Sequence, residues 1–375
     1  MTNKHLHIVT HDVPFPADYG GVIDLFYKLK ALHGMGVKIH LHCFTQGRAP
    51  QPELNKYCST VHYYPRRKNI SRFSLRLPFI VNSRKNDELI ANLQKDDHPV
   101  LLEGIHTTYY LYNGDLANRK ILVRLHNAEF EYYKQLAKQE SNFFKKICFL
   151  FESRLLKKYE RRLSNKGIFL AVSKQDAELY RREFNAGQVH YLPVFIPHTL
   201  AACREGRGCF CLYHGNLGIS ENEKAAIWLL EKVFSGTNIP FVIAGKNPSR
   251  KLKQLAHAHP NTCMVANPSD TELQDIIVKA QVHVLPSFNN TGIKLKLLNA
   301  LFNGRHCVVN AAAVEGSGLE GYCEVATDAL SFQNKIKTLN ELPFTEEEIQ
   351  KRQGLLQQLY NNEENAKKLM AFFWG

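Results

Sequence analysis

The chain has 375 residues, a formal net charge of +13, and 44% hydrophobic and 11% aromatic residues. This apolar content excludes a disordered polypeptide, and the length suggests two domains of ordinary size. The positive charge favours anionic partners such as nucleotides, phospholipid surfaces or nucleic acid, and it does not choose among them.

The cysteines and the N-terminus indicate the compartment. Nine cysteines lack the spacing of metal ligands, and the first residues, MTNKHLHIVTH, lack the apolar segment of a signal peptide. Stretches of about 18 consecutive apolar residues are absent, so we expect no membrane-spanning helix. We therefore expect reduced thiols in a cytoplasmic protein.

Short apolar runs alternate with helical patterns in the first half of the chain. A helix with leucines on one side is predicted at Val22–Leu32. Strands separated by helices pair in parallel, with helices on both faces of the sheet. The predicted strands are His5–Thr10, Val37–Phe44, Val61–Tyr64, Val100–Glu103, Ile121–Leu125 and Gly167–Val172.

Two of these strands carry histidines at alternate positions, His5 and His7 in one and His40 and His42 in the other. Four histidines so arranged suggest a metal cluster or, alternatively, polar faces of two strands with a period of two residues. We favour the second interpretation and predict no metal site.

A basic helix is predicted at Asn142–Leu163. Its cations outnumber its two glutamates, and its other side is rich in Phe and Leu, which is typical of a helix that touches anionic lipid over residues 143–163. A helix between domains with a solvated basic face is the alternative. The cations are Lys145, Lys146, Arg154, Lys157, Lys158, Arg161 and Arg162.

The polar segment 198–208 contains glycines and predicts a linker between a first domain at 1–197 and a second at 209–360. The final helical segment ends in an apolar cluster, so we expect 361–375 to cross back onto the first domain. Within the second domain, strands are predicted at Cys209–Tyr213, Phe241–Ala244, Val282–Leu285 and Cys307–Val309, and helices at Glu223–Phe234 and Thr271–Ala280.

Polar groups follow two strands of the first domain. Gly20 and Gly21 start a helix after the first strand and would let a ligand approach the backbone. His126, Asn127 and Glu129 follow the strand that ends at Leu125, and His126 is a candidate to bind a substrate or move a proton. A plain turn and a structural histidine are the alternatives.

The second domain has its candidate site at a helix start. After the loop Pro286–Gly292, a helix opens with Lys294 and Lys296, where free N–H groups and the helix dipole attract phosphate. Lys296 and Asn299 share one face, which suits a diphosphate and a sugar hydroxyl. The alternative is a surface helix with two solvated lysines. Lys246 follows another strand, and it is either a phosphate contact or a lysine of the loop surface.

Several motifs are absent from the sequence. It contains no GxxxxGK[ST], no Asp-x-Asp and no GxSxG. The sequence therefore does not indicate a nucleotide bound through a metal ion, or the nucleophile elbow of a hydrolase. No nucleic-acid motif appears either.

The ordered motifs resemble those of the retaining glycosyltransferases of family 4, also called glycosyl transferases group 1, which have the GT-B fold. HGNLGISENEKAAIWLL resembles the opening of their second domain, and IPFVIAGKNPS resembles its next strand. The similarity spans nearly the whole chain. The positions that correspond to family hallmarks are Gly20, Gly21, His126, Gly215 and Thr291–Asn299.

The chain departs from the family at three positions. Thr291 and Asn299 stand where the family has the two glutamates of a Glu-x7-Glu pair, although TGIKLK resembles a variant with a "GTxxK" pattern. Asn216 stands where an arginine often follows the glycine. An asparagine still bonds a hydroxyl, but without the assistance of a charge.

The resemblance implies an α/β protein with two Rossmann-like doubly wound domains that face a central cleft. It implies a retaining transferase that moves a sugar from a nucleotide-diphosphate donor to a glycan or lipid-linked acceptor in bacterial surface polysaccharide or lipopolysaccharide synthesis. No cofactor or metal and no nucleic-acid partner is implied. The catalytic candidates are His126, Asn127 and Glu129, and the donor-binding candidates are Gly20, Gly21, Gly215, Asn216, Lys246, Asn290, Thr291, Gly292, Ile293, Lys294, Lys296 and Asn299.

Two other functions stay open at this point. A sugar-nucleotide epimerase can share this architecture, but it would need carboxylates that the stretch Thr291–Asn299 lacks. A catalytically weakened binding subunit is favoured by the loss of the same two glutamates. If the basic helix binds lipid, the protein would work at the inner face of the cytoplasmic membrane.

Overall fold

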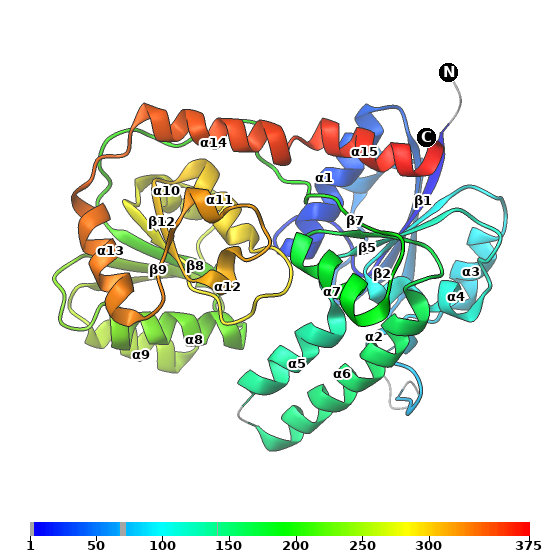
Figure 1. The fold of residues 1–375 in the computed structure, drawn as a ribbon, viewed down its shortest axis with the longest axis horizontal. Coiled ribbons are helices and arrows are strands. Elements are labelled where there is room, and N and C mark those ends of the chain that lie inside the picture. The colour runs from blue at the N-terminus through cyan, green and yellow to red at the C-terminus, as the bar shows by residue number, and fades with distance from the viewer. Residues whose placement is uncertain (1–3, 68–72, 141) are drawn as a thin grey trace. The chain divides into compact units, whose positions relative to one another are not determined.

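The chain folds into two compact units, which a computed structural model describes for residues 4–67, 73–140 and 142–375 (Figure 1). Unit 1 comprises Met1–Pro197 and Tyr360–Gly375, and unit 2 comprises His198–Leu359. The first three residues of the predicted first domain, its residues 68–72, and Ser141 before the basic helix lie outside the described residues. Each unit contains one sheet of parallel strands.

The sheet of unit 1 has the strand order β3-β2-β1-β4-β5-β6-β7. All neighbours pair in parallel, because helices connect consecutive strands and cover both faces. Apolar side chains on both faces bury the strands. The strands are β1 His5–Thr10, β2 Lys38–Thr45, β3 Thr60–Pro65, β4 Val100–Glu103, β5 Ile121–Leu125, β6 Ile168–Ala171 and β7 Val189–Tyr191.

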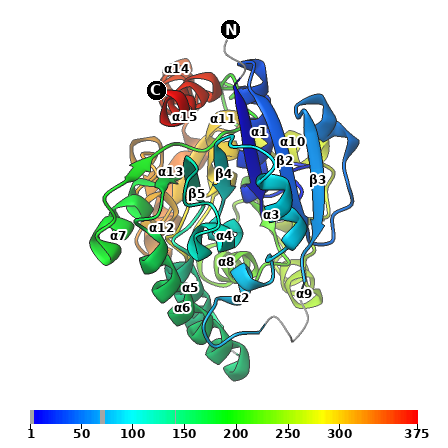
Figure 2. The same cartoon turned by 90° about the vertical axis from the view of Figure 1, so that its right-hand side faces the viewer.

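The two faces of this sheet have separate cores. One face packs against α1 (Gly20–Gly34), η1 (Pro52–Lys56) and the last helix, α15 (Asn362–Trp374). The opposite face is the one turned to the viewer in Figure 2, where α3 and α4 stand in front of the strands. Its helical elements are α2 Phe79–Asn82, α3 Asp87–Leu93, η3 Ile105–Thr107, α4 Tyr109–Asn113, α5 Glu129–Gln139, α6 Phe143–Leu163 and α7 Lys174–Phe184.

The helices α5 and α6 form an antiparallel pair that extends away from the sheet of unit 1 (Figure 1). Asn142 caps α6 by accepting a hydrogen bond from the backbone N–H of Lys145. The second half of α6 is anchored in the core through Leu156, Tyr159 and Leu163, whereas its first half is exposed. The sequence does not show this division, because apolar residues occur in both halves.

The sheet of unit 2 has the order β10-β9-β8-β11-β12-β13, again with parallel neighbours. Its strands are β8 Cys211–Asn216, β9 Phe241–Lys246, β10 Thr262–Ala266, β11 Val282–Val284, β12 His306–Val309 and β13 Glu324–Val325. Its helical elements are α8 Ser220–Trp228, η4 Leu229–Val233, α9 Arg250–Ala258, α10 Asp270–Lys279, α11 Leu295–Asn303, α12 Ala311–Val314, η5 Glu320–Tyr322, α13 Ala329–Glu341 and α14 Glu346–Leu359.

The predicted elements differ from the structure mainly at their ends. The predicted final helix is two helices, α14 and α15, because the side chain of Asn361 caps a new helix by accepting from the N–H groups of Glu363 and Glu364. The strand predicted from Cys209 begins at Cys211 in the structure. The short strands β7, β10 and β13 were not predicted.

Residues 198–208, the predicted linker, are counted in unit 2. Backbone N–H groups of this segment donate to partners in that unit: Ala202 to the carbonyl of Phe302, and Gly206 to that of Phe344. The segment is therefore held against unit 2 by hydrogen bonds.

In the part of the chain that the structure describes, none of the helices combines the length and the apolar character that crossing a bilayer demands.

We predict that Gly245→Ala destabilises unit 2. Gly245 lies opposite Gly215 in the pairing of β8 and β9, and an added Cβ would overlap the carbonyl oxygen of Gly215. Because Gly215 and Gly245 lie in two paired strands, moving the strands apart to make room for the Cβ should cost about 2–3 kcal/mol. Thermal or urea unfolding measures the loss.

The matched control is Gly354→Ala in α14, where an added Cβ meets no atom within 4 Å. This change should stabilise by about 0.5–1 kcal/mol, since alanine favours a helix more than glycine does. Equal stability of the two variants would contradict the close approach of β8 and β9.

Candidate functional site

A buried network of four charges lies beneath the carboxyl edge of the sheet of unit 1. The ammonium of Lys28 donates to Asp24 Oδ2 at 2.9 Å and to Glu103 Oε1 at 2.6 Å. Arg124 Nη2 donates to Asp24 Oδ1 at 3.2 Å. All four side chains are at most 1% exposed. Two cations balance two carboxylates, as burial of charge requires.

The two carboxylates keep their charge because of these partners. Burial alone would raise the pKa of Glu103, but Lys28 and His126 lower it below the usual value. Burial likewise acts to raise the pKa of Asp24, and Arg124 and Lys28 reverse this effect. Lys28 therefore fills the position between the carboxylates that a cation would otherwise take.

His126 stands on this network, directly after β5. Its Nε2 atom is 3.0 Å from Glu103 Oε2, and its Nδ1 atom is 3.9 Å from Asp24 Oδ2. Its side chain is 14% exposed. The hydrogen bond to Glu103 fixes the orientation of the ring, and Nδ1 faces the buried carboxylate of Asp24.

Two further histidines lie beside His126. The ring centroid of His11, which follows β1, is 5.7 Å from that of His126 and 5.2 Å from that of His106, which follows β4. Burial lowers the pKa of His11 and of His106 well below the usual value, so both are neutral near pH 7. Among the described residues, neither Nδ1 atom has a hydrogen-bond partner.

These two histidines line a cavity of about 470 Å³ in unit 1. Arg84 donates to the carbonyl of Ile80 at 2.7 Å and to that of His11, and burial lowers the pKa of Arg84 to about 9. With two arginines and one aspartate, the cavity attracts anions. The lining residues are His11, Asp12, Tyr19, Gln46, Arg66, Ile80, Arg84, His106, Tyr132 and Tyr133.

The other candidates of unit 1 have different surroundings. Glu129, the first residue of α5, is 3% exposed, and burial raises its pKa to about 8 while a hydrogen bond from Asn127 lowers it. The carboxylate that contacts His126 is Glu103, which the sequence presents as the end of a core strand. Gly20 and Gly21 begin α1, and an added Cβ on Gly21 would lie 3.3 Å from the ring of His11.

The second candidate site surrounds Lys296 in unit 2. Lys296 Nζ donates to Asn222 Oδ1 at 3.0 Å and to the hydroxyl of Tyr213 at 3.3 Å, and it lies 4.8 Å from the centre of the Tyr213 ring. Burial lowers the pKa of Lys296 to about 8, while Glu221 acts to raise it and Lys294 to lower it. Lys296 is thus a half-buried cation in the first turn of α11.

The start of α11 is unusual for a helix. Lys294 is the N-cap and makes no capping bond with its side chain, and the first turn has no acidic residue. The charges of two lysines interact unfavourably with the positive end of the helix dipole, whereas an anion at this place would be stabilised. Lys294 Nζ instead donates to the carbonyl of Thr291 at 2.8 Å.

The loop before α11 is ordered by its own polar groups. Thr291 is buried, and both its N–H and its hydroxyl donate to Asn289 Oδ1 at 2.9 Å. Gly292 has a φ of +63°, which favours glycine at the turn into the helix. Ser287 donates to Glu221 Oε1 at 2.9 Å, which joins this loop to α8.

The remaining donor-binding candidates are spread around this edge. Asn216 follows Gly215 and is the last residue of β8. Its Oδ1 atom accepts a hydrogen bond from the N–H of Gly218. Asn299 Oδ1 accepts from Asn303 within α11. Asn290 Nδ2 lies 3.4 Å from Glu315 Oε2, and the neighbouring Ile293 is half-buried.

Lys246 does not share the contacts of Lys296. It ends β9 and lies 3.9 Å from Asp270 with its side chain 44% exposed. Sequence reasoning also did not find Tyr213, Asn222 and Glu221, the groups around Lys296. Tyr213 lies within β8, and Glu221 and Asn222 lie in the helix α8 that follows it; the pairing of β8 with β11, which one sequence does not show, brings this part of the chain to the segment before α11.

Comparisons with known proteins agree with this architecture. Residues 209–341 match the family described as glycosyl transferases group 1. An uncharacterized 44.6 kDa protein in the cps region of Klebsiella pneumoniae is 30% identical over 331 residues, which cover 83% of this chain and 84% of that protein.

Two solved structures share the fold over almost their whole length. Sucrose-phosphate synthase from Thermosynechococcus elongatus has a TM-score of 0.67 at 16% identity, with 99% of this chain and 98% of that chain covered. HepE from Anabaena, solved with UDP and glucose, has a TM-score of 0.66 at 11% identity, with 98% and 99% covered. The fold is the expected GT-B α/β fold, and the chain is a glycosyltransferase that belongs to the family of glycosyl transferases group 1.

Proposed function

We propose that this glycosyltransferase moves a sugar from a nucleotide-diphosphate donor to a glycan or lipid-linked acceptor, with retention and without a metal, in bacterial surface polysaccharide synthesis. The relative in the cps region of Klebsiella pneumoniae supports the pathway, and the complex of HepE with UDP and glucose supports the donor class. The observation that carries the proposal is the half-buried Lys296 at an uncapped, positively charged helix start.

The diphosphate of the donor would bind at the start of α11. Lys296 is held by Asn222 and Tyr213 in the first turn of this helix, so its charge adds to the positive end of the helix dipole. When the bond from sugar to phosphate breaks, negative charge gathers on the leaving diphosphate. A fixed cation and backbone N–H groups at this place would stabilise that charge, the role that a metal has in other transferases.

We predict that Lys296→Ala weakens binding of UDP about tenfold to a hundredfold, because a charge-assisted contact contributes roughly 1.5–3 kcal/mol. Calorimetric titration with UDP, GDP, ADP and dTDP measures the effect and identifies the base. Since burial lowers the pKa of Lys296 to about 8, affinity of the wild type should fall as the pH rises from 7 to 9, when the ammonium loses its proton.

The control is Lys251→Ala, which removes an exposed lysine of α9 in the same unit. Its affinity and its pH dependence should equal those of the wild type. If Lys296→Ala binds all four nucleotides as tightly as the wild type does, the diphosphate does not bind at α11.

Unit 1 would position the acceptor and the sugar. The cavity beside His126 carries Arg66 and Arg84 and two neutral histidines, which suits an acceptor with a phosphate or carboxylate and several hydroxyls. His126, fixed by Glu103 and 14% exposed, would contact the sugar with the exposed part of its ring.

We predict that His126→Ala lowers the rate of sugar transfer about tenfold to a hundredfold without unfolding the chain. The ring is partly exposed and stands on a network whose four charges remain paired without it. Transfer from the donor selected by the nucleotide screen is measured by the mass gained by the acceptor, with thermal unfolding as the check on folding.

His33→Ala, at the exposed end of α1, is the control and should transfer at the wild-type rate. An unchanged rate in His126→Ala would remove this histidine from the site. Tight nucleotide binding by the wild type with no transfer to any acceptor would instead support a binding subunit. Thr291 and Asn299 favour that alternative because internal hydrogen bonds already occupy their side chains.

We also propose that the tip of the α5–α6 pair binds an anionic membrane surface. Four large apolar side chains are exposed on the first half of α6: Phe143, Phe144, Ile147 and Leu150 are 68%, 77%, 48% and 37% exposed. Lys145 and Lys146 lie among them and are exposed as well. This combination is typical of a helix that inserts into the interface of anionic lipid.

This surface is shorter than the stretch 143–163 expected from the sequence. In the second half of α6, Lys157 pairs with Glu183 at 2.8 Å, and Arg162 donates to the hydroxyl of Tyr112. These cations therefore have partners within unit 1, and the lipid-facing residues we propose lie at 143–150.

We predict that the double variant Phe143→Ser and Phe144→Ser lowers binding to vesicles that contain phosphatidylglycerol by about tenfold or more, since apolar area then no longer enters the bilayer. Vesicle sedimentation measures it, with Leu330→Ser, a 65% exposed leucine of unit 2, as the control. If the wild type sediments equally with vesicles that contain anionic lipid and with vesicles that lack it, the positive charge of the protein does not contribute to membrane binding. If the double variant binds as well as the wild type, the tip is not the contact.

A further inference from the structure

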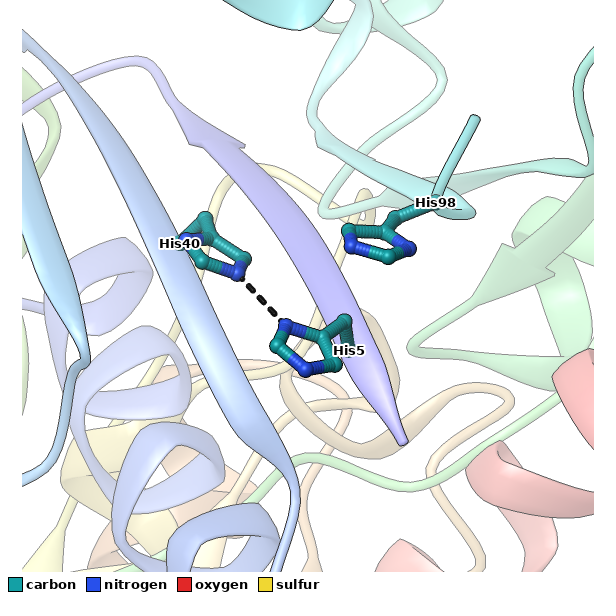
Figure 3. A group of neighbouring side chains, drawn as sticks. All are labelled: His5, His40 and His98. Atoms are coloured by element: carbon teal, nitrogen blue, oxygen red, sulfur yellow. Dashed lines mark hydrogen bonds between the residues drawn. The ribbon is translucent and has the colours of Figure 1, made fainter. Parts of the chain in front are cut away.

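Three histidines from separate segments meet on one face of the sheet of unit 1 (Figure 3). His5 begins β1, His40 lies near the start of β2, and His98 comes two residues before β4. Because β1 lies between β2 and β4, the three side chains gather at the amino ends of three neighbouring strands. The sequence hides this group, since His98 is 58 positions beyond His40.

The distances suit a shared ligand. Nδ1 of His5 and Nε2 of His40 are 2.9 Å apart, and one nitrogen from each of the three rings lies within 4.8 Å of the others. The ring of His98 stacks on that of His5 with centroids 4.5 Å apart. In a tetrahedral zinc site, with Zn–N bonds of about 2.0–2.1 Å, the ligand nitrogens are about 3.3 Å apart. The three rings are partly exposed, and their rotation would bring the nitrogen atoms to this spacing.

The surroundings provide what metal-binding histidines need. The second ring nitrogen of His40, Nδ1, is 3.0 Å from the hydroxyl of Thr60, which orients the ring. Asp96 supplies a negative charge nearby, although it also bonds His7 and Arg119.

We propose that His5, His40 and His98 bind one divalent transition-metal ion, with Zn²⁺ the favoured occupant and water as the fourth ligand. A donor set of three imidazoles suits zinc, nickel and copper, and does not suit Mg²⁺ or Ca²⁺. When the ion binds, the proton between His5 Nδ1 and His40 Nε2 moves to Nε2 of His5, and His40 keeps its proton on Nδ1 toward Thr60, so no net proton is released.

This site revises the expectation that the histidines of these strands bind no metal. That expectation took His5 and His40 together with His7 and His42 as the polar faces of two strands. In the structure, His7 and His42 form a hydrogen bond of 2.8 Å with one another. The proposed ion lies at the amino edge of the sheet, whereas His11 and His126 follow the carboxyl ends of β1 and β5. It would join three strands of unit 1 and is independent of the proposed transfer chemistry.

The test uses the full chain without an affinity tag, after removal of metal by a chelator. Cys148, Cys209 and Cys263 are exposed thiols that also bind zinc, so all three are replaced by serine in every protein compared. Titration with Zn²⁺ should give one ion per chain, and Co²⁺ should give a ligand-field spectrum without a thiolate band. Zn²⁺ should also raise the midpoint of thermal unfolding.

His98→Ala should lower the affinity for Zn²⁺ at least about tenfold and abolish the thermal shift. It lies in a loop, so its folding is least at risk, and the thermal scan without metal checks this. His257→Ala, an exposed histidine of α9, is the control and should bind as the parent does. A parent protein that binds no ion, or His98→Ala with the affinity of the parent, would overturn the proposal.

Discussion

The compensation of four buried charges by one another is the constraint on which the site of unit 1 depends. Asp24, Lys28, Glu103 and Arg124 come from α1, β4 and β5, and none of them is exposed by more than 1%. Removing any one would leave an unpaired charge in the interior, which costs several kcal/mol. The network therefore holds the helix and both strand ends in fixed positions, and His126 takes its orientation from it.

Unit 2 uses the opposite arrangement. The start of α11 concentrates positive charge, from Lys294, Lys296 and the helix dipole, without a carboxylate in the first turn to balance it. Such a site is less favourable empty than occupied by an anion. One unit therefore provides a preformed scaffold with neutral charge, and the other provides a charge that a ligand would neutralise.

Much of this could be predicted from the sequence, for a physical reason. Apolar runs and their period show where strands and helices occur, and this located β1, β4 and β5, the start of α1 at Gly20 and the lysines at the start of α11. The order of strands across a sheet leaves no such pattern in one sequence.

The groups that were not predicted are those that this order brings together. Glu103 meets His126 because β4 and β5 are neighbours, and Tyr213 meets Lys296 because β8 lies beside β11. His98 joins His5 for the same reason. For Lys246, its position at a strand end left two interpretations open, a phosphate contact and a lysine of the loop surface, and in the structure it lies 3.9 Å from Asp270 with its side chain 44% exposed.

The assignment of α15 to unit 1 has a consequence for how the protein is made. Its residues Ala366, Leu369 and Phe373 complete the core between α1 and the sheet, although they come after the whole of unit 2 in the chain. On the ribosome, the first 197 residues would emerge without these core residues while the whole of unit 2 is still being synthesised. The core of unit 1 is therefore completed only after unit 2 has been made.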